Sequence, residues 1–125
     1  MPQTDRVLII EEEALLALDI ESILAEHSPV EVTHHRNIAE TTARLADLSA
    51  VGLALVEAHF GAPEVAEFTQ RLVEAGIATV VMSADPPSLD LFPHATPLGK
   101  PFDAASLLAA CATARSKVTR DAEWT

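Results

Sequence analysis

The sequence predicts a three-layer α/β fold in which helices cover both faces of a five-stranded parallel sheet. Short apolar runs suited to strands alternate along the chain with segments whose apolar residues recur at helical spacing. Two of the runs, Val7 to Ile10 and Leu53 to Val56, are apolar throughout. Strands of a parallel sheet read this way because both of their faces are buried.

The predicted strands are short runs bounded by polar or turn residues and rich in β-branched side chains. Because helical segments follow all but the fourth of them, right-handed crossovers place the strands parallel in one sheet. The five predicted strands are Val7 to Ile10, Val30 to Thr33, Leu53 to Val56, Ala78 to Met82 and, with a weaker pattern, Thr96 to Leu98.

Helices are predicted after each of the first three strands and after Asp103. Asn37 is a good N-cap for the second helix, and Gly76 is a C-cap for the third. The apolar positions that indicate the four helices are Leu16, Ile20, Ile23 and Leu24; Ile38, Leu45 and Leu48; Val65, Phe68 and Leu72; and Ala104, Leu107, Leu108 and Cys111.

The stretch between the fourth and fifth strands departs from the alternation. Pro86, Pro87 and Pro93 each remove a backbone donor and disfavour helix at the preceding residue. We therefore expect the helix here to be shortened to a turn or missing. The whole chain, 1–125, is predicted to be one domain with a core from about 6 to 116 and a polar tail from 117 to 125.

Composition excludes several classes of function. Nineteen acidic residues against eight Lys and Arg give a net charge of -11, which disfavours nucleic acid and anionic membranes as partners. No apolar run is long enough to span a membrane, and residues 1–6 do not resemble a signal peptide, so a cytoplasmic location is expected. Cys111, the single cysteine, lies in an apolar helical pattern and is expected to be buried.

Polar side chains follow the predicted strands at the point where each strand ends. Three glutamates, residues 11–13, follow the first strand, and Glu57, Ser83 and Lys100 follow the third, fourth and fifth. Ligands of open α/β sheets bind at the carboxyl ends of the strands. Carboxylates, a hydroxyl and an ammonium at that edge would suit a hard cation and a phosphoryl group.

At these residues the chain resembles the receiver domain of two-component response regulators, the CheY-like family. Glu11 and Glu12 resemble its acidic pair, Ser83 its hydroxyl residue, and Lys100-Pro101-Phe102 its Lys-Pro motif. The resemblance implies a flavodoxin-like fold with strand order 2-1-3-4-5. It also implies a stand-alone, non-enzymatic domain in phosphorelay signalling whose partner is a sensor histidine kinase or another signalling protein, with a second copy of the chain as an alternative.

Three departures from the family pattern suggest a degenerate receiver, or pseudo-receiver, and the shortened or missing helix before the fifth strand is one of them. Glu57 stands where the resemblance places the phospho-accepting aspartate, and Pro97 stands where a switching aromatic residue is usual. Three roles of Glu57 stay open. It pairs only with Lys100, it is a partial stand-in for phospho-aspartate, or it accepts a phosphoryl group itself.

Metal binding and flavin binding are the further alternatives. Glu11 and Glu12 either cap the first helix as solvated acids or bind Mg²⁺ weakly together with Glu57 and, by resemblance, the backbone carbonyl of His59. The pair His34-His35 lacks the spacing of a zinc site. An FMN-binding flavodoxin-like protein is a remote alternative, because three glutamates after the first strand would repel the phosphate.

Overall fold

The computed structural model describes residues 5–44, 50–58, 63–84 and 95–124. They form one five-stranded parallel sheet and four helices. The elements in chain order are β1 (Asp5–Ile10), α1 (Ala14–His27), β2 (Val30–His35), α2 (Ile38–Arg44), β3 (Leu53–Glu57), α3 (Pro63–Glu74), β4 (Ala78–Ser83), β5 (Thr96–Gly99) and α4 (Ala104–Trp124).

The strands are arranged in the order β2-β1-β3-β4-β5, which confirms the predicted fold class. Every neighbouring pair is parallel. The order reverses between β1 and β3, since the chain first adds β2 on one side of β1 and then builds the remaining strands on the other. The carboxyl ends of β1 and β3 therefore flank the switch point of the sheet.

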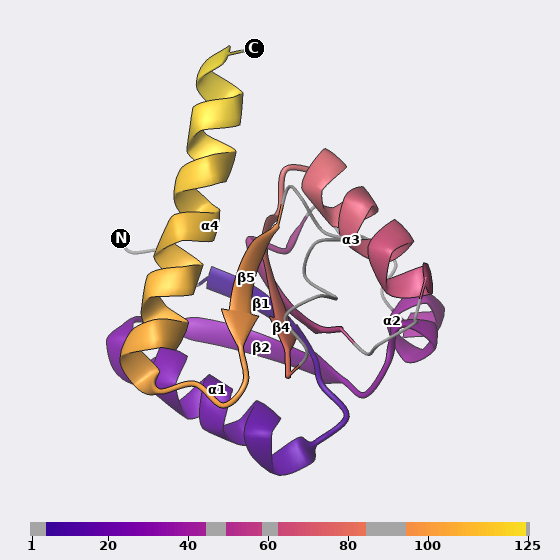
Figure 1. Cartoon of the computed structure of the whole chain (residues 1–125), viewed down its shortest axis with the longest axis vertical. Helices are drawn as coiled ribbons and strands as arrows, with labels where there is room; N and C mark the ends of the chain where they lie inside the picture. The colour runs from indigo at the N-terminus through magenta and orange to yellow at the C-terminus, as the bar shows by residue number, and fades with distance from the viewer. Residues whose placement is uncertain (1–4, 45–49, 59–62, 85–94, 125) are drawn as a thin grey trace.

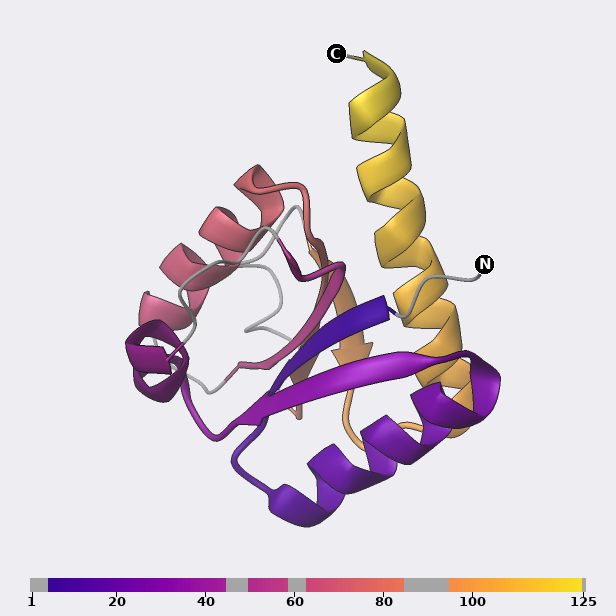
Figure 2. The ribbon, with the colours of Figure 1, turned by 180° about the vertical axis from the view of Figure 1, so that it is seen from behind.

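Helices cover both faces of the sheet, α1 and α4 on one side and α2 and α3 on the other (Figures 1 and 2). Alternate strand residues point to opposite faces, so Ile9 packs with Ile20 and Leu107 in one core, and Ile10 packs with Phe68 in the other. Because each strand contributes residues to both cores, β1 and β3 are apolar at nearly every position.

The predicted helix boundaries rest on caps that the structure contains. Asn37 Oδ1 accepts the backbone N–H of Glu40 at 2.8 Å, and Asp103 Oδ1 accepts that of Ser106 at 2.7 Å. Gly76 follows α3 with a φ of 79°, a conformation that favours glycine at a helix C-cap.

The C-terminal helix differs from the prediction, because α4 continues through the expected tail to Trp124. No proline or glycine interrupts residues 104–124, and Lys117 Nζ donates to the carbonyl of Ala95 at 3.2 Å. Val118 is also partly buried against the core. The last turns of α4 project beyond the sheet (Figures 1 and 2).

Some predictions fall on residues outside the described ranges. These are the shortened helix between β4 and β5, at 85–94, and the positions Leu45 and Leu48 of the second helix. Cys111 is buried as predicted, with 2% of its surface exposed, and burial raises the pKa of its thiol to about 11. No described helix has the length and apolar character that crossing a bilayer requires.

Candidate functional site

The candidate site lies at the carboxyl edge of the sheet, where four strands deliver polar residues. Glu11 directly follows β1, Glu57 is the last residue of β3, Ser83 is the last residue of β4, and Lys100 directly follows β5. Parallel strands bring these positions to one edge although they are up to 89 residues apart in the chain.

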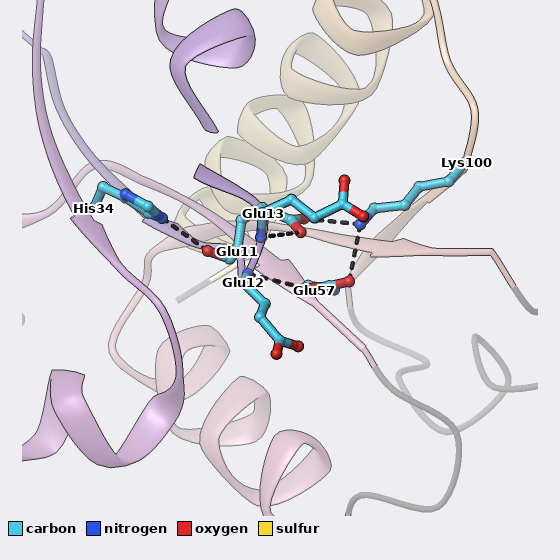
Figure 3. Close-up of polar contacts among 6 residues, drawn as sticks. All are labelled: Glu11, Glu12, Glu13, His34, Glu57 and Lys100. Carbon is cyan, nitrogen blue, oxygen red and sulfur yellow. Dashed lines mark hydrogen bonds and ion pairs between the residues drawn. The ribbon is translucent and has the colours of Figure 1, made fainter. Parts of the chain in front are cut away.

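Lys100 connects the carboxylates at the ends of β1 and β3. Its Nζ donates to Glu11 Oε2 at 2.8 Å and to Glu57 Oε1 at 2.9 Å (Figure 3). The side chains of Lys100 and Glu57 are 16% and 14% exposed, and that of Glu11 is fully buried. Both ion pairs are therefore largely shielded from solvent, so their loss leaves charges that water cannot easily stabilise.

Backbone donors hold the second oxygen of each carboxylate. The N–H of Glu12 donates to Glu57 Oε2 at 3.2 Å, and the N–H of Glu13 donates to Glu11 Oε1 at 3.1 Å. All four carboxylate oxygens thus accept a hydrogen bond, and the loop between β1 and α1 donates two of these four bonds.

His34, at the end of β2, supports this loop from the opposite side. Its Nε2 donates to the carbonyl oxygen of Glu11 at 2.7 Å (Figure 3). The neighbouring His35 is buried, and its Nδ1 lies 2.9 Å from Thr41 Oγ1 in α2. From the sequence, the two histidines suggest only a zinc site, and they lack the spacing for one. The predicted strand order places β2 next to β1, and this order could have indicated that a residue at the end of β2 contacts the loop after β1.

Burial and charge shift the pKa values of the three linked groups. Burial, with the nearby Glu57 carboxylate, raises the pKa of Glu11 despite the hydrogen bond from Lys100. Burial alone would also raise the pKa of Glu57, but hydrogen bonds from Lys100, Glu11 and the backbone of Glu12 together lower it. Burial lowers the pKa of Lys100, and its two carboxylate partners more than offset this, so the pKa is raised overall.

The other predicted site residues take different places around this cluster. The Glu12 side chain is exposed and points away from Lys100 (Figure 3). Ser83 is buried, and its carbonyl oxygen accepts the Lys100 N–H at 2.9 Å. Pro97 is exposed on β5, and His59 lies outside the described residues.

The arrangement of the carboxylates does not fit a divalent cation. Within the ranges that the structure describes, no group of three or more acidic, histidine or cysteine side chains is placed to hold a metal ion. The Glu11 and Glu57 oxygens that a metal would need each face the Lys100 ammonium at under 3 Å. Mg²⁺ requires near-octahedral oxygen ligands at about 2.0 to 2.1 Å and would have to displace this ammonium.

Comparisons with known proteins find similarity in structure only. No protein-family model and no curated protein matches the chain. A response regulator from Thermotoga maritima has a TM-score of 0.74 at 21% identity, covering 91% of this chain and 99% of its own. A response regulator receiver protein from Sinorhizobium medicae has a TM-score of 0.75 at 24% identity, with coverage of 93% and 98%.

A signal receiver domain from Clostridium thermocellum is similar in structure at still lower identity. Its TM-score is 0.77 at 12% identity, covering 90% of this chain and 98% of its own. The chain therefore has the fold of response regulator receiver domains over most of its length.

Proposed function

We propose that this chain is a receiver domain of two-component signalling that works through protein–protein contact, without phosphorylation of Glu57. The observation that carries the proposal is the Lys100 bridge, because the ammonium contacts Glu57 and Glu11 at the edge where the receiver fold places its phosphorylation site. The domain is expected to be non-enzymatic.

The contacts of Glu57 argue against its use as a nucleophile. Attack on phosphorus needs a carboxylate oxygen that faces the donor, with a cation free to neutralise the incoming charge. Glu57 Oε1 is bound by Lys100, Oε2 is bound by the backbone of Glu12, and the lowered pKa indicates a stabilised carboxylate. A misplacement on the order of 1 Å by the additional methylene can by itself cost about 10²-fold in rate.

A carboxylate held in this way imitates a phosphorylated aspartate only in part. It extends negative charge toward Lys100, but it carries one charge and two acceptor oxygens, whereas a phosphoryl group adds about -1.5 to -2 and three oxygens. We expect Glu57 to keep the site in one fixed arrangement that partners recognise without a covalent signal.

The surface of α1 beside the site supports a protein partner. Leu15 is 82% exposed and Leu18 is 59% exposed, one helical turn apart. Glu12 and Glu13 are exposed just before this helix, so the surface combines apolar contact area with negative charge. A histidine kinase or another signalling protein with an apolar stripe and basic flanks would fit. A second copy of the chain is the alternative.

Phosphate-affinity electrophoresis and intact-mass measurement after incubation with acetyl phosphate and Mg²⁺ test the proposal. We expect no adduct on the wild type or on Glu57→Gln. Glu57→Asp is the matched variant, because it keeps the carboxylate and removes the additional methylene. A phosphoryl adduct on the wild type that is absent from Glu57→Gln would establish an active receiver and overturn the proposal.

Sedimentation velocity separates the two kinds of partner. If the partner is another protein, we expect the wild type to sediment as a monomer at micromolar concentration. A wild-type dimer that dissociates in Leu15→Glu would identify a second copy of the chain as the occupant of α1.

A further inference from the structure

A cavity of about 450 Å³ is lined by Glu57 at the end of β3 together with residues at the end of β1 and at the starts of α2 and α3. Lys100 and Glu11 do not line it. Its walls are mostly apolar and include Ile10 at the end of β1, Ile38 in α2 and Val65 in α3. The volume is that of a small-ligand site, and the position is the switch point of the sheet, where α/β folds bind ligands.

Two opposite charges lie at the rim of this cavity. Arg36 precedes α2, and Glu64 lies in the first turn of α3; both are exposed. Across the described ranges, neither side chain has an ion pair or hydrogen bond. The adjacent carboxylate of Glu57 is already bound by Lys100 and by the backbone of Glu12. Among the described residues, the cavity therefore combines the guanidinium of Arg36, just before α2, with the carboxylate of Glu64, at the start of α3, in a mostly apolar lining.

We propose that this cavity binds a small zwitterion with an apolar body, of the chemical class of apolar α-amino acids. The ligand carboxylate pairs with Arg36, whose planar guanidinium can donate two parallel hydrogen bonds. The ligand ammonium pairs with Glu64, and the apolar side chain packs against Ile10, Ile38 and Val65. This site goes beyond the proposed signalling function and does not depend on it.

The distribution of charge favours a zwitterion over ligands with one charge. Phosphates and other compact anions would meet Glu57, Glu64 and the net charge of -11. A simple amine would pair with Glu64, but its apolar body would lie next to Arg36 and leave the guanidinium without a partner. Only a ligand with both charges satisfies both rim side chains while burying apolar surface.

Calorimetric titration of the full chain with L-phenylalanine, phenethylamine and 3-phenylpropanoate tests the site. These probes share the phenyl group and differ in charge. We expect L-phenylalanine to bind at least about 10-fold more tightly than either analogue, since each lacks one charge-assisted hydrogen bond. Amide shift changes in NMR spectra should centre on the first turns of α2 and α3.

Substitution of the two charged cavity residues, Arg36 and Glu64, tests which charge of the ligand each of them binds. Arg36→Gln should weaken L-phenylalanine about 10-fold and leave phenethylamine unchanged, and Glu64→Gln should weaken both of these probes. Arg6→Gln and Glu67→Gln are the matched controls, because they make the same charge changes at exposed positions that do not line the cavity. Equal affinity for phenethylamine and L-phenylalanine, or no saturation by millimolar L-phenylalanine, would overturn the proposal.

Discussion

Replacing Lys100 by Met removes the ammonium that joins Glu11 and Glu57 while preserving most of the apolar stem. The two carboxylates then face each other at a largely buried position, because Glu11 is fully buried and Glu57 is 14% exposed. The folded protein can relieve the repulsion by protonating Glu11, whose pKa is already raised by burial. A protonated Glu11 can donate to Glu57, so the pair stays hydrogen-bonded.

The cost of that proton sets the magnitude of the effect. Holding a glutamate protonated at pH 7 against an ordinary pKa of about 4.3 costs about 3.7 kcal/mol, at 1.36 kcal/mol per pH unit. Residual solvent access at Glu57 screens part of the repulsion, so we expect Lys100→Met to lose about 2 to 3 kcal/mol. At pH 5 the same proton costs only about 1 kcal/mol.

The direction of the pH dependence follows from linkage. In Lys100→Met the folded-state pKa of Glu11 rises further above its unfolded value. Because this carboxyl pKa is raised, Lys100→Met is nearly as stable as the wild type below the unfolded-state pKa. The variant loses stability relative to the wild type as pH rises toward the folded-state pKa. The Lys100 pKa is itself raised by its partners, and its stabilising contribution is therefore fully present at pH 7.

Urea unfolding at pH 7 and pH 5, followed by circular dichroism, measures the effect. With a slope of about 1.5 kcal/mol/M, the midpoint of Lys100→Met should fall by about 1 to 2 M at pH 7 and by under about 0.7 M at pH 5. Lys117→Met is the matched control, since Lys117 donates to a backbone carbonyl instead of a carboxylate. Equal losses in the two variants at pH 7, or a loss that does not shrink at pH 5, would refute the coupling of Lys100 to the two glutamates.

Three further predictions concern the metal, the thiol and the core. Calorimetry should give a dissociation constant for Mg²⁺ above about 1 mM, because the ion must displace the Lys100 ammonium. A micromolar dissociation constant, with binding that Glu12→Gln abolishes, would contradict this prediction. Iodoacetamide at pH 8 should modify Cys111 only in urea, because the thiol is buried and its pKa is raised to about 11; modification of the folded protein would show that it is accessible. Leu72→Ala should lower the free energy of unfolding in urea by about 2 to 5 kcal/mol and Leu15→Ala by close to zero, because Leu72 is fully buried and Leu15 is 82% exposed. Similar losses in the two variants would contradict the burial of Leu72 in the core beneath α3.

Local patterns were sufficient for the elements of the fold. Strands β1 and β3 were predictable because a strand buried on both faces must be apolar at successive positions. Asn37 and Asp103 marked helix starts because their side chains accept backbone N–H groups three residues later. The end of α4 was not predictable in this way. Its polar residues after 116 resemble a tail, whereas continued helix and the packing of Val118 depend on the neighbouring core.

The sequence by itself determined the parallel α/β architecture and the presence of Glu57 and Lys100 at one edge of the sheet. Alternation of strands and helices requires parallel crossovers, and these bring all strand ends together. Only the tertiary structure decided which of three consecutive glutamates enters the site. Glu11 is buried while Glu12 and Glu13 are exposed.

The path of the β1–α1 loop is the physical reason for that choice. The Glu11 N–H donates to the carbonyl of His35 at 3.1 Å, and the Glu12 N–H donates to Glu57. Such hydrogen bonds join residues that are distant in the chain, and no local periodicity encodes them. They orient the side chains of the loop, so the contact of Glu11 with Lys100 is a property of the assembled sheet.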